Sequence, residues 1–117
     1  MQIAFTRLQG ECGHAAGRRL LAELCGGTLP EIAETKLGKP YFPNSTLHFS
    51  ISHTKNHAFC CLSEKNVGID AEEMDRKVSP ALADKVLSEG EKTRYTAASD
   101  KNAALLRLWV LKEAYAK

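Results

Sequence analysis

An alternation of apolar and polar residues in the middle of the chain constrains the fold more than any other sequence feature. In residues 47–53 (LHFSISH), the apolar side chains of Leu47, Phe49 and Ile51 share one face of an extended strand, while the polar side chains share the other. Two further stretches rich in strand-forming residues follow, each after a turn. We therefore expect an antiparallel meander of three strands with one face packed on helices. The predicted strands are residues 47–53, 58–62 and 67–72.

Helices are expected before and after this meander in the sequence. Residues 14–24 are rich in good helix formers, and Gly26-Gly27 supplies a stop. After the strands the chain again favours helices, and Ser88 with Glu91 three residues later matches a capping box. Asp100 or Ser99 is expected to cap the last helix. The later helices are predicted at residues 80–87, from 88 or 89 onward, and from about 102 to the end.

Residues 2–8 alternate in character and predict an additional edge strand. Together these elements predict an α+β fold, in which a small antiparallel sheet packs on helices. At 117 residues the chain has room for one domain, covering residues 1–117.

Composition and charge exclude several classes of function. A formal charge of +2 with scattered Lys and Arg residues is not typical of a nucleic-acid-binding protein. The sequence contains no window of about 18 to 20 apolar residues, so we expect no membrane span and a cytoplasmic location. The four cysteines lack a C-x-x-C spacing and are expected to be reduced thiols, mostly buried.

The first candidate site is the pair of acids Asp70 and Glu72 on the predicted third strand. Both project from the polar face, about 6.5 to 7 Å apart along the strand. Paired oxygen ligands of this kind suit Mg²⁺, although two acids on an exposed strand can also be simply solvated. Gly68 on the same face removes a side chain where a ligand or another backbone needs to approach.

The second candidate site lies in the last predicted helix, which is apolar nearly all round and is therefore expected to be buried. Lys112 and Glu113 within such a helix need a partner, a metal or a ligand. In one interpretation Glu113 joins Asp70 and Glu72 in a cation site, with Lys112 and Lys117 available for phosphate. In the other, Glu113 and Lys117 form a simple (i, i+4) pair and Lys112 extends into solvent.

The third candidate site is Ser52 with His53, at the end of the predicted strand 47–53. A hydroxyl and an imidazole at a strand end can bind phosphate oxygens, and the Gly38-Lys39-Pro40 loop is expected nearby. The other expectation is that His53 is only structural, and we interpret His48 and His57 as structural or surface residues.

Five short motifs, taken in order, resemble the Sfp-type 4′-phosphopantetheinyl transferases over about residues 38–117. The resemblance implies that Asp70, Glu72 and Glu113 bind Mg²⁺. The motifs are residues 38–40 (GKP), 49–54 (FSISHT), 67–72 (VGIDAE), 87–91 (LSEGE) and 109–117 (WVLKEAYAK).

The same resemblance implies roles for other residues. Lys39 and Pro40 match a loop beside the adenine of coenzyme A, and Ser52 and His53 match a strand end that holds its phosphates. Lys112 and Lys117 match basic residues near the pyrophosphate. Glu113 is a candidate base for the incoming serine hydroxyl, with Lys117 as its catalytic neighbour. Glu91 matches a family position to which we assign no role.

The implied activity is transfer of 4′-phosphopantetheine from coenzyme A to a serine of an acyl- or peptidyl-carrier protein, with release of 3′,5′-ADP. Family members continue into a second, similar subdomain, and their active site lies between the two halves. We therefore expect this chain to be a half that is truncated or that pairs with itself as a homo-oligomer. Two alternatives are a non-catalytic module that binds coenzyme A or a carrier protein, and an inactive self-associating fragment.

Overall fold

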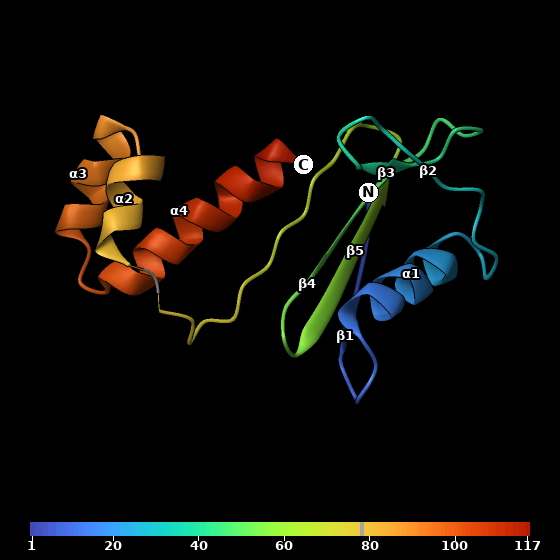
Figure 1. Cartoon of the computed structure of the whole chain (residues 1–117), viewed down its shortest axis with the longest axis horizontal. Helices are drawn as coiled ribbons and strands as arrows, with labels where there is room; N and C mark the ends of the chain where they lie inside the picture. Colours follow the sequence, from blue (N-terminus) through green and yellow to red (C-terminus); the bar gives the residue numbers. More distant parts are fainter. Residues whose placement is uncertain (78) are drawn as a thin grey trace.

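The computed structural model describes residues 1–77 and 79–117 and contains two lobes (Figure 1). The sheet lobe consists of the strands and the first helix, and the helical lobe consists of the last three helices. The elements of the sheet lobe are β1 (Gln2–Arg7), α1 (Gly13–Leu24), β2 (Ala33–Glu34), β3 (Pro40–Tyr41), β4 (His48–His53) and β5 (His57–Ser63). The elements of the helical lobe are α2 (Pro80–Val86), α3 (Glu89–Ala97) and α4 (Lys101–Ala116).

The main sheet is antiparallel with the strand order β1-β5-β4, and β2 and β3 form a separate small pair. The predicted α+β class with a small antiparallel sheet is therefore confirmed, and so is the N-terminal strand. The sheet's composition differs from the predicted meander, because β1 occupies the free edge of β5. Residues 67–72 form no strand and run as an irregular segment beside the sheet (Figure 1).

The reason for this difference is how the segment attaches to β4. The backbone N–H of Ile69 donates to the hydroxyl of Ser50 at 3.1 Å, and the hydroxyl of Ser52 donates to Asp70 at 3.1 Å. Side chains of β4, rather than a backbone ladder, therefore hold residues 67–72. A period of two in the sequence fits both arrangements, since an extended segment need not pair with a strand.

Helix α1 packs closely on β4 through two glycines. A Cβ atom on Gly13 would lie 2.3 Å from the ring of His53, and one on Gly17 would lie 2.4 Å from Cγ2 of Ile51. The helix ends as predicted, with Gly26 and Gly27 at φ values of +91° and +108°. The core under α1 contains Ala16, Leu20, Leu21, Phe42, Phe49, Ala58, Cys60 and Leu62.

The helical lobe has a smaller core and well-defined helix ends. Ala83, Leu87 and Leu105 form its cluster of buried apolar residues. The capping box predicted at Ser88 and Glu91 is present, and Asp100 caps α4 through the backbone N–H of Ala103. These local predictions are confirmed.

An extended segment joins the lobes, and the C-terminal end of α4 returns toward the sheet (Figure 1). A Cβ atom on Gly68 would lie 2.0 Å from the carbonyl oxygen of Ala114, so glycine is required where α4 meets this segment. The molecule is elongated, since its radius of gyration of 16.1 Å exceeds the roughly 13 Å of a compact domain of this length. None of the described helices has the length and apolar character to span a bilayer.

The four cysteines are free thiols, as expected, and two of them are buried. Burial raises the pKa of the Cys60 thiol to about 12, so it stays protonated. Cys12 is exposed, and its sulfur accepts a hydrogen bond from the backbone N–H of Ala15 at the start of α1.

Candidate functional site

The candidate site forms where residues 67–73, the end of β4 and the end of α4 meet. Asp70 lies at the centre of this junction. One oxygen of its carboxylate, Oδ1, accepts from Ser52 Oγ at 3.1 Å and lies 3.3 Å from Nζ of Lys117. The same Lys117 Nζ donates to the backbone carbonyl of Ile51 at 3.3 Å. A serine, an aspartate and a lysine predicted separately from sequence are thus in direct contact.

The segment of residues 67–73 is also attached to the hairpin turn between β4 and β5. The carboxylate of Glu73 accepts from Thr54 Oγ1 at 2.6 Å and from the backbone N–H of Asn56 at 3.3 Å, and it lies 3.4 Å from the ring of His57. These contacts, the Thr54 hydrogen bond first, lower the pKa of Glu73. Sequence reasoning missed Glu73, and it interpreted His57 only as structural or surface, which agrees with this anchoring contact.

Asp70, Glu72 and Glu113 line one cavity of about 230 Å³. The remaining lining residues are Arg76 and Trp109. The three acids, which lie on the linking segment and on α4, therefore share one space. The simple (i, i+4) pair of Glu113 with Lys117 is not among the described contacts, because Lys117 Nζ contacts Asp70.

Each of these carboxylates already has a partner from the chain. Asp70 pairs with Lys117, Glu72 pairs with Arg76, and Glu113 accepts the indole N–H of Trp109 at 2.9 Å. Among residues 1–77 and 79–117, no three His, Cys, Asp or Glu side chains are close enough to form a metal centre as they stand. Their oxygen donors suit Mg²⁺, so the residues fit this ion by donor chemistry, provided that Asp70 and Glu72 exchange their partners.

Arg76 is a cavity residue that sequence reasoning missed. Its guanidinium contacts Glu72 and lies 4.6 Å from the ring centroid of Trp109. Its backbone carbonyl accepts a hydrogen bond from the side-chain amide of Asn102 at 2.8 Å. An arginine in an irregular segment carries no periodic signal. The only available indication was that Arg76 follows the acid pair by a few residues in a stretch with no predicted element.

A second cavity, of about 410 Å³, lies under the Gly38-Lys39-Pro40 loop. Its lining includes Lys39 and Pro40 together with Ser50, Ile51 and Lys117. The side chain of Lys39 donates to the backbone carbonyl of Lys117. The predicted loop residues therefore lie beside the same end of α4 that contacts Asp70.

Two other predicted residues lie at the margin of this site. His53 is exposed, and its ring covers Gly13 at the first turn of α1. Lys112 pairs with Glu91 of α3 at 2.9 Å and is not among the residues that line the carboxylate cavity. The Ser88 backbone N–H and Lys112 lower the pKa of Glu91 to about 2. The unassigned Glu91 thus caps α3 and joins α3 to α4.

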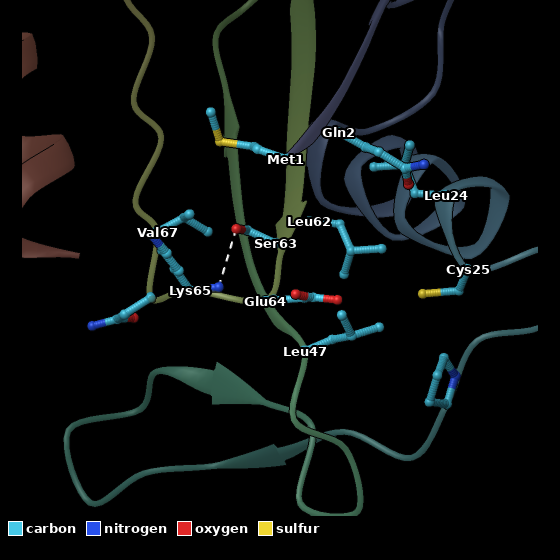
Figure 2. A pocket seen from close by; sticks show the side chains of 12 residues that line it. Met1, Gln2, Leu24, Cys25, Leu47, Leu62, Ser63, Glu64, Lys65 and Val67 are labelled. Atoms are coloured by element: carbon cyan, nitrogen blue, oxygen red, sulfur yellow. Dashed lines mark hydrogen bonds between the residues drawn. The ribbon is translucent and has the colours of Figure 1, made fainter.

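The largest of these cavities lies elsewhere, where β1 begins and β5 ends. It measures about 940 Å³, and its lining includes none of the predicted site residues. Figure 2 shows apolar side chains of Leu24, Leu47 and Leu62 around it, with the Lys65 backbone N–H donating to the Ser63 hydroxyl at 3.1 Å. Cavity size alone would therefore have directed attention away from the acids.

Comparisons with known proteins agree with the arrangement of these motifs. Residues 66–117, which carry the acid pair and all of α4, match the family model of the 4′-phosphopantetheinyl transferase superfamily. The resemblance predicted from the motifs is confirmed, and the chain belongs to this superfamily.

A curated relative is the 4′-phosphopantetheinyl transferase gsp of Aneurinibacillus migulanus. The two are 30% identical over 86 residues, which cover 72% of this chain and 35% of the relative. The chain thus spans about a third of the length of that protein.

Proposed function

We propose that this chain contributes catalytic residues to a Mg²⁺-dependent transfer of 4′-phosphopantetheine from coenzyme A to a serine of an acyl- or peptidyl-carrier protein. The product besides the modified carrier would be 3′,5′-ADP. Membership of the superfamily supports phosphopantetheinyl transfer in general, and so does the similarity to a 4′-phosphopantetheinyl transferase.

The observation that carries this proposal is the convergence on Asp70. Ser52 and Lys117 both reach its Oδ1, while Glu72 and Glu113 line the same cavity. Moving a phosphoryl group from a diphosphate is mainly a problem of positioning and of neutralising charge. Carboxylates that hold a cation, next to a lysine that can bind phosphate oxygens, supply both requirements.

The residues have separate tasks in this proposal. Bound Mg²⁺ would neutralise the diphosphate, and Asp70, Glu72 and Glu113 would hold it. Lys39 and Pro40 would contact the adenosine part of coenzyme A, while Ser52, His53 and Lys117 would bind its phosphates. Lys112 would act through its pair with Glu91, which fixes α4.

In the transfer step, the serine oxygen of the carrier forms a bond to the phosphorus that bears pantetheine. The bond from that phosphorus to the oxygen of 3′,5′-ADP breaks, and the serine proton passes to Glu113. The indole N–H of Trp109 occupies one oxygen of Glu113, so its other oxygen is the candidate proton acceptor.

The test is mass spectrometry of an apo carrier protein incubated with the chain, coenzyme A and Mg²⁺. We expect a gain of one phosphopantetheine mass, and a loss of rate of about 100-fold or more in Asp70→Asn, because that variant removes a charge from the reacting centre. Asp75→Asn is the matched control, since Asp75 is exposed and does not line the carboxylate cavity. Equal rates in the two variants would contradict the role of Asp70.

A non-catalytic module that binds coenzyme A or a carrier protein is the second candidate. The observation that favours it is that each carboxylate of the cavity already has a partner from the chain. Titration of coenzyme A with and without Mg²⁺ separates the two: the transferase requires metal-dependent binding, whereas the module binds equally well without the metal.

Partners follow from the same proposal. Carrier proteins are acidic, so a chain with a formal charge of +2 has suitable complementarity. A second copy of the chain completing the cleft is a further expectation, and sedimentation of the chain at increasing concentration tests it. The cytoplasmic location expected from the sequence stays a prediction.

A further inference from the structure

The carboxylate cavity contains its own counter-charges. Three acidic side chains line one cavity of about 230 Å³, and ionised carboxylates that share one space repel one another unless positive charge lies between them. Arg76 pairs with Glu72, and Lys117 pairs with Asp70. Two of the three carboxylates are therefore each paired with a singly charged basic side chain.

Arg76 is held at this place from several directions. Its guanidinium contacts Glu72 and lies over the ring of Trp109, at 4.6 Å from the centroid. A guanidinium over an indole face is attracted by the ring's electrons. The backbone of the same residue is fixed by the amide of Asn102, which donates to its carbonyl at 2.8 Å.

The side chain of Arg76 is nevertheless able to leave. Its exposed fraction is 46%, whereas that of Glu72 is 24%. A partly exposed ion pair of this kind contributes little net free energy, because water solvates the separated charges well. The backbone anchor at Asn102 would keep the arginine near the cavity after its guanidinium has moved.

Charge balance indicates what could replace these contacts. A divalent cation brings the same two charges that Arg76 and Lys117 supply together. Exchange of the two side-chain cations for one divalent cation would leave the net charge beside the carboxylates unchanged. Monovalent cations such as K⁺ lack this equivalence, and they bind carboxylates weakly in water.

We propose that Arg76 is the internal counter-ion of this cavity and that it competes with a divalent cation for Glu72. The inference rests on the proposed function for the identity of the cation, Mg²⁺. When the cation binds, the guanidinium of Arg76 leaves both Glu72 and the face of Trp109. The net charge beside the three carboxylates is therefore the same before the cation arrives and after it binds.

The chain provides its own reporter for this exchange. Trp109 is its only tryptophan, and Arg76 lies over its ring. The experiment titrates the full chain with Mg²⁺ at constant ionic strength, following tryptophan fluorescence and, in parallel, the heat of binding. We expect a saturable fluorescence change in the unmodified chain, with the midpoint that calorimetry gives.

Arg76→Gln is the informative variant. Because it removes the competitor, we expect the Mg²⁺ affinity to increase about three- to tenfold, as for any site whose binding-competent state becomes fully populated. The Mg²⁺-dependent fluorescence change should be lost, since no guanidinium remains to leave the indole. Lys77→Gln is the matched control, because it removes the same charge from the neighbouring exposed residue.

Three results would overturn the inference. These are an affinity in Arg76→Gln that is unchanged or lower, an equal gain in Lys77→Gln, or no detectable Mg²⁺ binding to the unmodified chain. Circular dichroism of each variant shows that it is folded before it is compared.

The carrier-modification assay is scored separately, so failures of the two proposals can be told apart. Competition without transfer contradicts the proposed transferase activity and leaves the role of Arg76 standing. Transfer without competition does the reverse.

Discussion

The sheet lobe and the helical lobe differ in how their residues are held. Leu20, Leu21 and Phe49 lie in a continuous core between α1 and the sheet, and all are at most 3% exposed. In the helical lobe, Ala83, Leu87 and Leu105 form a much smaller core, and α4 keeps Leu111 and Tyr115 exposed. The sheet lobe is therefore held mainly by burial of apolar side chains. The helical lobe depends more on helix caps, on ion pairs and on the close contact of Gly68 with Ala114.

This difference matters because the candidate site draws on both lobes. Ser52 and His53 belong to the sheet lobe, Glu113 belongs to α4, and Lys117 directly follows α4. Asp70 lies on the segment between them. The geometry of the site therefore depends on the less extensively buried half, and perturbing each half separately tests the comparison.

The largest effect on stability is expected for Leu21→Ala. Leu21 is fully buried, so truncation leaves a cavity in the main core and should cost about 2–5 kcal/mol of the free energy of unfolding. Urea unfolding followed by far-UV circular dichroism measures it. Leu37→Ala, at a side chain 97% exposed, is the matched control and should change stability by less than about 0.5 kcal/mol.

Leu105→Ala is expected to be the next largest, near the lower end of the same range of about 2–5 kcal/mol, because fewer side chains surround Leu105. Trp109 lies in α4 of the helical lobe, so in this variant its fluorescence should change at lower urea than the circular dichroism signal does. Leu111→Ala, at a 60% exposed position of the same helix, is the control. Coincident transitions would mean that the lobes unfold together.

Gly68→Ala tests the contact between the lobes. Its Cβ would lie 2.0 Å from the carbonyl oxygen of Ala114, so the end of α4 must shift, at a cost of about 1–3 kcal/mol. Lys117 and Glu113 would move with it, and we expect the Mg²⁺ affinity of the chain to fall. Gly90→Ala is the control, because nothing lies within 4 Å of its added Cβ and alanine favours the helix.

The smallest expected effect is the loss of folding stability at low pH that comes from protonation of Glu91. Its pKa in the folded chain, about 2, lies below the ordinary value of 4.5, so its contribution to stability is present above pH 4.5. That contribution is lost as the pH falls toward 2. Stability measured across this window should depend less on pH in Glu91→Gln, while Glu89→Gln, at a side chain 95% exposed, should behave like the unmodified chain.

Local signals predicted the helices well, because their information lies within a few residues. The stop at Gly26-Gly27, the box of Ser88 with Glu91 and the cap at Asp100 are all short-range features. The sheet was only partly predictable. Residues 2–8 and 67–72 both alternate, and only the distant pairing of β1 with β5 decides which of them joins the sheet.

The residues of the candidate site were likewise predictable only in part. The motifs named Asp70, Glu72, Ser52 and Lys117, and the structure brings these residues together from segments far apart in the chain. The contact of Arg76 with Trp109 and the pairing of Lys112 with Glu91 could not be predicted, because they depend on how α4 packs on the linking segment and on α3. Such contacts leave no periodic signal in the sequence.

The two glycines of α1 limit how this chain can vary. Since Gly13 abuts His53 and Gly17 abuts Ile51, a larger residue at either position needs a compensating change on the strand. We expect positions 13 and 53, and likewise 17 and 51, to change in pairs in functional mutant libraries. An alanine at either helix position would then be tolerated only beside a smaller strand residue. The surface of α1 therefore restricts how the ring of His53 can be oriented.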